Sequence, residues 1–159
     1  MSRRFATVIL SLVLTGTASA DILIGQYSPT SPATPQPLYG FRDAANGDVA
    51  PMRRLGGSAG GLIEPTQGVY EPLEDVIYLA DYNGYAVRVF PVGANGDAAP
   101  KRVLDSPAMG QVRAIAVDAL HEELMIIAFN SYIAVWPLTA SGSNVSPVRQ
   151  IQWGGGNSQ

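Results

Sequence analysis

The stretch ANGDAAPKRVL, from Ala94 to Leu104, repeats the stretch ANGDVAPMRRL, from Ala45 to Leu55, which lies 49 residues earlier. A more diverged third copy, SGSNVSPVR, runs from Ser141 to Arg149 and keeps the spacing between its proline and its arginine. Self-similarity at a period of 20 to 50 residues is the signature of repeat architectures. The chain is therefore expected to contain three related structural units.

Short apolar runs accompany each copy of this stretch. The run VRVFP (87–91) matches IAVWP (133–137) and, more loosely, PLYGF (37–41), while GVYE (68–71) matches IAVD (115–118). The runs DILIG (21–25), DVIYLA (75–80) and ELMIIA (123–128) are also alike. All are rich in β-branched or aromatic residues and bounded by turn residues, which predicts strands, and no helical periodicity occurs after the first twenty residues. The chain is predicted to be all-β.

We predict eleven strands, near residues 22–25, 38–42, 51–55, 67–71, 75–81, 85–91, 100–104, 113–118, 123–129, 132–138 and 147–153. The runs VIYLA and LMIIA are apolar on both alternating faces, which indicates sheets covered on both sides. Four antiparallel strands per unit and a period near 50 favour β-propeller blades. The prediction is a partial or half propeller of about three four-stranded blades, near 21–55, 67–104 and 113–153, the first lacking its inner strand.

The unit FPVGANGDAAPKRVL (90–104), followed by IAVD, LMIIA and IAVW, resembles the NHL-type propeller repeats of secreted bacterial proteins. The resemblance covers most of the chain from residue 21 onward and implies blades of a six-bladed ring. It implies no single activity, because such repeats occur in binding modules, scaffolds and a few enzymes.

The repeated stretch itself has a structural interpretation. Asn-Gly tolerates a positive φ, as primed hairpin turns require, so the stretch is expected to form the hairpin between the third and fourth strands of a blade. Pro51 and Pro100 would begin an outer strand, where a missing N–H is tolerated. Arg53 and Arg102 would then alternate with apolar neighbours, and the run Gly56–Gly61 would link two blades.

The first twenty residues have the pattern of a secretory signal peptide. Arg3 and Arg4 precede the apolar run FATVILSLVL (5–14), and Ala18-Ser19-Ala20 is a cleavage signal before Asp21. A membrane anchor is the alternative, but the apolar run is shorter than the roughly 20 residues that span a bilayer. We therefore expect a secreted or periplasmic protein, with residues 21–153 forming the partial propeller and residues 154–159 a flexible glycine-rich tail.

The amino-acid composition limits the classes of partner and the chemistry that are expected of this chain. Loss of Arg3 and Arg4 would change the formal charge from −3 to −5, and this mild acidity argues against nucleic acid or an anionic membrane. The chain has no cysteine, so it has neither disulfides nor thiolate chemistry. Signal cleavage would leave no integral membrane segment.

Three blades do not close a ring, since propellers typically have 4 to 8. We expect self-association, with two copies giving six blades, or completion by another propeller fragment; a gene fragment of a larger propeller and an open solenoid are the alternatives. The proline-rich insertion 27–37 is expected to be extended and either a solvated loop or an arm that contacts a partner.

Catalytic and metal-binding patterns are weak. His121 is the single histidine and lies in an acidic turn, where a solvated role is expected. Asp43, Asn46 and Asp48 resemble the start of a calcium loop, but the downstream acid of such a loop is missing. Since no nucleophile elbow, phosphate loop or zinc-binding helix occurs, we expect no cofactor, no metal and no catalytic residues, although an enzyme is not excluded.

The loops between the second and third strands of a blade, and those between blades, are the expected ligand surface. Tyrosine beside amide side chains suits a glycan or a peptide. The candidate binding residues are Asp81, Tyr82, Asn83, Asn130, Ser131 and Tyr132. The function predicted first is a non-enzymatic binding or scaffolding module; a structural assembly subunit and a propeller hydrolase or lyase acting on a sugar or lactone are the alternatives.

Overall fold

The computed structural model describes residues 21–25, 36–128 and 132–152. Within these ranges the chain is all-β, with eleven strands and no helix, so no described helix is long and apolar enough to cross a membrane. The strands form three antiparallel sheets in which neighbours in sequence are neighbours in the sheet. The predicted fold class, blade-like antiparallel units in an all-β chain, is confirmed.

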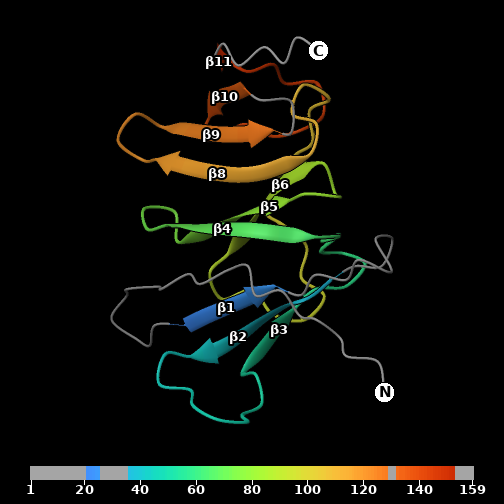
Figure 1. Ribbon diagram of the computed structural model, residues 1–159, viewed down its shortest axis with the longest axis vertical. Coiled ribbons are helices and arrows are strands. Elements are labelled where there is room, and N and C mark those ends of the chain that lie inside the picture. The colour runs from blue at the N-terminus through green and yellow to red at the C-terminus, as the bar shows by residue number, and fades with distance from the viewer. Residues whose placement is uncertain (1–20, 26–35, 129–131, 153–159) are drawn as a thin grey trace, which may run out of the picture.

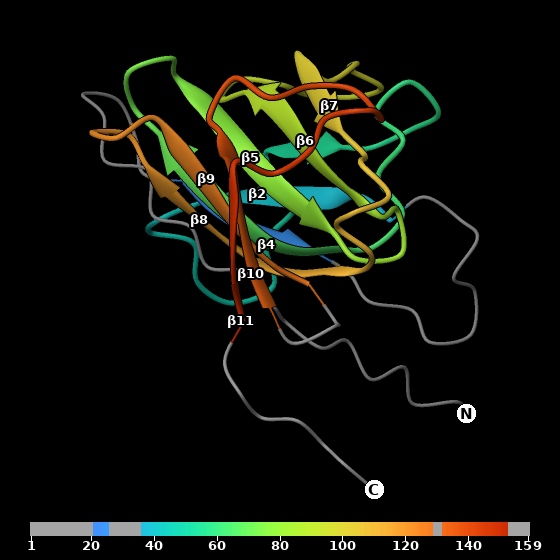
Figure 2. The ribbon, with the colours of Figure 1, turned by 90° about the horizontal axis from the view of Figure 1, so that it is seen from above.

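Each sheet is one unit of the repeat, and the three are stacked along the long axis of the molecule (Figure 1). Seen from above, the sheets overlie one another (Figure 2). Blade 1 contains β1 (Asp21–Gly25), β2 (Leu38–Arg42) and β3 (Arg53–Leu55). Blade 2 contains β4 (Pro65–Glu71), β5 (Val76–Asp81), β6 (Ala86–Pro91) and β7 (Arg102–Leu104). Blade 3 contains β8 (Val112–Asp118), β9 (Glu123–Ala128), β10 (Tyr132–Pro137) and β11 (Arg149–Gln152).

The outer strands β3, β7 and β11 begin two residues later than the sequence predicted. Pro51, Pro100 and Pro147 carry no N–H, so the first backbone hydrogen bond to the third strand comes from the residue that follows each proline, just before the outer strand begins. The three donors act alike, with Met52 N bonded to Gly40 O at 2.8 Å, Lys101 N to Val89 O at 2.7 Å and Val148 N to Val135 O at 2.8 Å. The proline therefore fixes where the outer strand begins in every blade.

The hydrophobic cores lie between blades. One cluster joins Leu23, Leu38 and Leu55 of blade 1 to Ile77, Leu79 and Phe90 of blade 2. A larger cluster joins the other face of blade 2 to blade 3, with Tyr78, Val87 and Leu104 on one side and Leu124, Ile126 and Trp136 on the other. Blade 2 is covered on both faces, and every residue of β5 is buried.

Blade 3 departs from the expectation that its central run is covered on both sides. In β9, buried residues alternate with partly or largely exposed ones, and Ile127 is 38% exposed. The buried face packs on blade 2, whereas nothing in the described chain covers the opposite face. The prediction was wrong for this strand because a blade at the end of the stack has only one neighbour.

The repeated ANGD segment lies between the antiparallel third and fourth strands, as predicted, but in a long connection that also contacts the preceding blade. Residues 92–101 separate β6 from β7, and Gly96 within them pairs in parallel with Leu55 of the preceding blade. Gly96 N donates to Arg54 O at 2.8 Å and Gly56 N donates to Gly96 O at 2.9 Å. The φ of 66° at Gly96 does match the positive value expected of this glycine.

The next junction repeats this contact. Gly142, with a φ of 98°, pairs in parallel with Leu104, and its N–H donates to Val103 O at 2.7 Å. We call the segments Asn46–Asp48, Asn95–Asp97 and Ser141–Ser143 the docking turns of blades 1, 2 and 3. The docking turn of each later blade thus extends the hydrogen bonding of the blade before it.

Side chains of the docking turn in blade 2 strengthen the junction. Asn95 Oδ1 accepts the Arg54 N–H at 3.1 Å, and Asp97 Oδ1 accepts the Ala59 N–H at 2.7 Å. The bond from the Ala59 backbone is the main reason why the pKa of the Asp97 carboxyl lies below its ordinary value. The acidic residue of the motif therefore holds the Gly-rich linker between blades 1 and 2.

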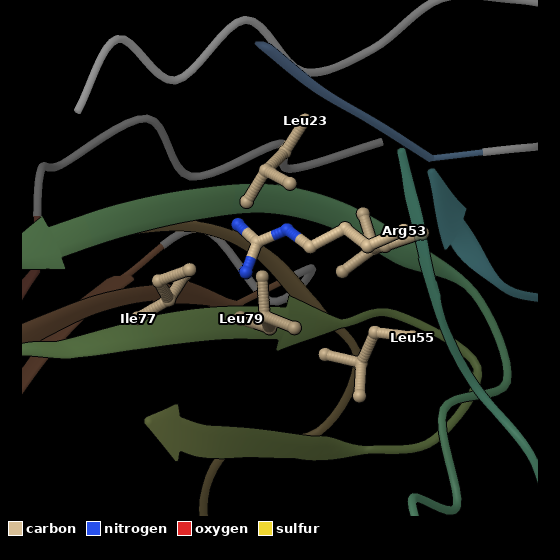
Figure 3. Close-up of a pocket in the computed structure, with 6 residues that line it drawn as sticks. Leu23, Arg53, Leu55, Ile77 and Leu79 are labelled. Atoms are coloured by element: carbon tan, nitrogen blue, oxygen red, sulfur yellow. The ribbon is translucent and has the colours of Figure 1, made fainter. Parts of the chain in front are cut away.

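The motif arginines also reach the next blade. The Arg53 guanidinium extends between Leu23 and Leu79 (Figure 3) and donates to the Val92 carbonyl of blade 2. It passes over Gly40, where an added Cβ would lie 2.6 Å from Arg53 Cγ, so a larger residue opposite the arginine would displace it.

At the second junction the arginine acts through a tyrosine. Arg102 donates to Tyr78 Oη at 2.7 Å, and Tyr78 donates to the Leu138 carbonyl of blade 3 at 3.1 Å. Arg102 also forms an ion pair of 2.7 Å with Glu74. Leu138 and Val92 are equivalent, each following the proline that ends the third strand. The expectation that these arginines only alternate along an edge strand therefore misses their contact across the junction.

Glu74 makes stability dependent on pH. Hydrogen bonds from Arg102 and Lys101 lower the pKa of its carboxyl from 4.5 to about 2. Because the folded pKa lies below the unfolded one, the stabilisation is complete above pH 4.5 and is lost as the pH falls toward 2. Glu74→Gln should therefore lower the free energy of unfolding at pH 7, and its difference from wild type should shrink as the pH falls toward 2.

Urea unfolding between pH 2 and pH 7 measures this difference. Glu122→Gln provides the comparison, because Glu122 is an exposed acid in the equivalent turn of blade 3. A difference between wild type and Glu74→Gln that stays constant over this range contradicts the proposed role of the carboxylate.

Candidate functional site

The predicted binding residues that the structure describes lie at the end of the blades where the second and third strands meet. Asp81 is the last residue of β5, and Tyr82 and Asn83 follow it in the β5–β6 loop. Tyr132 is the first residue of β10. Asn130 and Ser131 lie outside the described residues.

The strand ladders correct the sequence correspondence between blades 2 and 3. Asp81 pairs with Pro65 and Ala128 pairs with Val112, so Asp81 is equivalent to Ala128. By the same registers Tyr132 takes the position of Ala86, within the strand, and is not the counterpart of a loop residue. The connection after β9 is one residue shorter than that after β5, which shifted the alignment of the sequences.

Asp81 connects the sheet to the linker that precedes it. Its side chain is fully buried and forms an ion pair of 2.9 Å with Arg88 Nε. Its carboxylate also accepts the backbone N–H groups of Ile63 at 3.1 Å and of Glu64 at 2.7 Å. These three donors occupy the carboxylate, so Asp81 positions Glu64 and does not face a ligand directly.

The β5–β6 loop needs a glycine beside this carboxylate. A Cβ added at Gly84 would lie 2.0 Å from Asp81 Oδ2, well inside any tolerable contact. The loop therefore closes over Asp81 only because residue 84 has no side chain, and this closure places Tyr82 and Asn83 above Glu64.

Polar side chains from two blades converge above Asp81. Asn83 donates from Nδ2 to the Glu64 carboxylate and accepts at Oδ1 from Gln111 Nε2 at 3.2 Å. Tyr82 N donates to Glu64 O at 2.9 Å, and the Arg113 guanidinium lies 5.6 Å from the centre of the Tyr82 ring, within the range of a cation–π interaction. We call Glu64, Tyr82, Asn83, Gln111 and Arg113 the junction cluster.

The junction cluster contains one carboxyl group whose protonation is perturbed. Partial burial raises the pKa of Glu64, the negative charge of Asp81 raises it further, and the hydrogen bond from Asn83 opposes both. Together the cluster offers a carboxyl, two amides, a guanidinium and an aromatic ring, all only partly buried or exposed. Such a set can hydrogen-bond a polar ligand and stack on a flat one.

Tyr132 lies at the same end of blade 3 but contacts a different segment. It is half-buried, packs against the core between blades 2 and 3, and its hydroxyl donates to the Ala108 carbonyl. Tyr132 therefore fixes the linker of residues 105–111 that carries Gln111.

Sequence reasoning named the blade-to-blade segments as places to look but missed Glu64, Gln111 and Arg113. A signal was present, because the inner strands β4 and β8 align at a spacing of 47 residues, from Pro65 to Val112. Extending this alignment by one residue makes Glu64 and Gln111 equivalent. The amide of Asn83 therefore bonds to both Glu64 and Gln111, which hold the same repeat position in two successive blades.

The weak metal-binding candidates lie elsewhere. His121 and Asp118 form an exposed pair, with 2.7 Å between His121 Nδ1 and Asp118 Oδ2, and the hydrogen bond to the Asp118 carboxylate raises the pKa of the histidine. Asp43, Asn46 and Asp48 are exposed, and Asp43 Oδ1 accepts the Ala44 N–H. Within the described ranges, no group of three or more His, Asp or Glu side chains is placed to hold a metal ion.

Neither the family models nor the curated proteins compared with this chain give a match.

The buried ion pair of blade 2 has an apolar counterpart in blade 3. Asp81 is equivalent to Ala128, and Arg88 is equivalent to Ala134, and both alanines are buried. Removing one partner of a buried pair costs about 3 to 5 kcal/mol, because the other charge stays buried alone. Asp81→Ala and Arg88→Ala should each be strongly destabilising, whereas the double variant should lose at least about 1 kcal/mol less than their sum.

Urea unfolding of the four proteins in this double-mutant cycle measures the coupling. Glu123→Ala with Arg149→Ala is a comparison cycle on an exposed pair, for which coupling below about 1 kcal/mol is expected. Additive losses in the Asp81–Arg88 cycle contradict the assigned pairing.

Proposed function

We propose that this chain is a non-enzymatic extracytoplasmic binding or scaffolding module, built from NHL-type propeller repeats and completed by self-association. The observation that supports binding is the junction cluster, in which polar side chains meet beside the β5–β6 loop, between blades 2 and 3. Ligand sites of propellers commonly lie at one face of the ring, where loops of neighbouring blades meet.

The chemistry of the junction cluster favours a glycan or a peptide. Tyr82 offers an aromatic face, and its hydroxyl adds a donor and acceptor at the ring edge. Asn83 and Gln111 have amides that both donate and accept, and Arg113 adds a cation. A ligand with hydroxyl or amide groups around a flat apolar patch matches this combination.

The proposed location rests on the N-terminal sequence. Residues 1–20 combine paired arginines, a short apolar run and an A-x-A site, the composition of a cleaved secretory signal. A mature chain without cysteine, secreted or periplasmic, would depend on burial between blades for stability.

Self-association is supported by the exposed ends of the stack. The outward face of blade 3 includes Ile127 and Ile151, which are 38% and 49% exposed, and a single-layer sheet with one uncovered apolar face favours association. Two copies of three blades would supply six, the number of the NHL-type ring. The same exposed face favours the second candidate, a structural subunit whose role is assembly itself.

Ligand binding is tested by a thermal-shift screen of the purified chain against glycans, cell-wall fragments and peptides. A ligand that binds the folded state raises the unfolding midpoint by mass action. Tyr82→Ala should weaken the affinity about tenfold, because loss of an aromatic contact costs about 1 kcal/mol and its hydrogen bond is lost too. Calorimetry on the variant and on wild type measures this ratio.

Leu73→Ala is the matched control, because Leu73 is 82% exposed and lies at the opposite end of blade 2. It should leave the affinity unchanged. A ligand whose affinity is unaffected by Tyr82→Ala, Tyr132→Ala and Arg113→Ala binds elsewhere and contradicts the choice of site. Stoichiometric divalent metal in the purified protein would instead favour the hydrolase or lyase alternative.

Size-exclusion chromatography with light scattering tests the assembly. We expect the mass of two chains across a tenfold range of concentration, because the outward face of blade 3 exposes large apolar side chains. A monodisperse monomer contradicts self-association and favours a fragment of a larger propeller.

A further inference from the structure

We propose that two copies of this chain assemble head to tail, with the docking turn Asn46–Asp48 of one copy bonded to the outer edge of β11 in the other. This inference rests on the proposed self-association and specifies its surfaces. It follows from the two junctions inside the chain, where a docking turn bonds to the outer strand of the preceding blade in the same way.

The outer strands reveal which end lacks its partner turn. Leu55, Leu104 and Ile151 hold equivalent positions, each two residues beyond the motif arginine. Leu55 and Leu104 bridge to the glycines of docking turns and are 6% and 2% exposed. Ile151 has no such turn in the described chain and is 49% exposed. Ile151 is therefore a large apolar residue, like Leu55 and Leu104, but no docking turn covers it in the described chain.

The docking turn of blade 1 has the features of the two that are engaged. Gly47 has a φ of 75°, close to the 66° of Gly96, and Asn46 is equivalent to Asn95. Within the described ranges, neither Asn46 nor Gly47 forms a hydrogen bond with another blade. By analogy, Gly47 N would donate to Gln150 O, and Asn46 Oδ1 would accept the Gln150 N–H of the second copy.

Apolar side chains around the two surfaces also correspond. Ala98 and Val145, which follow the docking turns of blades 2 and 3, pack against the cores between blades. Val49 holds the equivalent position in blade 1 and is 43% exposed. It would pack beside Ile151, just as Ala98 packs in the cluster that contains Leu55.

The charged side chains at the two proposed surfaces are also of opposite sign. Arg53 reaches the carbonyl of Val92, and Arg102 reaches that of Leu138 through Tyr78. Arg149 is the third motif arginine, and the residue equivalent to Val92 in blade 1 is Asp43. Arg149 is 52% exposed and pairs with Glu123 of its own blade. Across the proposed contact it would meet a carboxylate as well as a carbonyl.

Each contact joins unlike surfaces, since a turn on one copy meets a strand on the other. Such interfaces close into rings when the rotation permits and otherwise extend as filaments. Two contacts of this kind would close two copies into the six-bladed ring of the proposed function. The alternative dimer would join like surfaces, either two β11 edges or two blade 1 faces.

Single cysteines distinguish these arrangements, because the chain contains none. Asn46→Cys and Gln150→Cys are made separately, mixed, and treated with a short bismaleimide. Head-to-tail docking predicts crosslinked dimers in the mixture and little crosslinking of either variant alone. Crosslinking of one variant to itself, or none in the mixture, overturns the proposal.

Charge substitution gives a second measurement. Ile151→Asp and Val49→Asp should each weaken association more than tenfold in sedimentation equilibrium, whereas Leu73→Asp, on a more exposed residue of blade 2, should not. If wild type associates and both variants associate with the same affinity, the assigned surfaces are wrong but self-association stands. Wild type that stays monomeric overturns both, and a ligand bound at Tyr82 would still support the binding role.

Discussion

A single-layer sheet has two faces, and no blade of this chain can bury both of them by itself. Every buried cluster in the described residues combines side chains from two neighbouring blades, and strand β5 of blade 2 is fully buried only because that blade lies between two others. This dependence on neighbours explains the repeat, since stacking similar units lets each provide the cover that the next one needs. It also explains the docking turns, whose backbone bonds hold successive sheets at a fixed register.

Much of the fold could be predicted because the apolar runs and turn residues are local signals. All eleven strands lie where the sequence places them, and the outer strands differ only where a proline delays the ladder. The role of Asn95-Gly96-Asp97 could not be predicted in this way. A positive φ serves a hairpin and a docking turn equally well, and the choice depends on Leu55, which lies 41 residues earlier.

The candidate site was predictable in location but not in composition. Tyr82 and Asn83 follow a strand directly, so their loop could be found from the chain alone. Asp81 resembled a ligand-facing residue because it lies in the same short polar run, yet its carboxylate is buried against Arg88 and the linker amides. Burial of this kind depends on Arg88, which lies on the neighbouring strand, and on a glycine at residue 84. Sequence patterns give the spacing of these residues but not their orientation.

Blade 2 has a buried ion pair at a position where blade 3 has two apolar residues. Asp81 and Arg88 of blade 2 become Ala128 and Ala134 of blade 3, and both partners change together, as expected when a lone buried charge is costly. The polar pair holds Glu64 beneath Asn83, and Asn83 in turn contacts Gln111 of the next unit. A ligand that bonds to this cluster would therefore contact two blades at once. Binding at the cluster and the spacing between blades are then linked, because any interaction that fixes the stack also fixes the distance between Glu64 and Gln111.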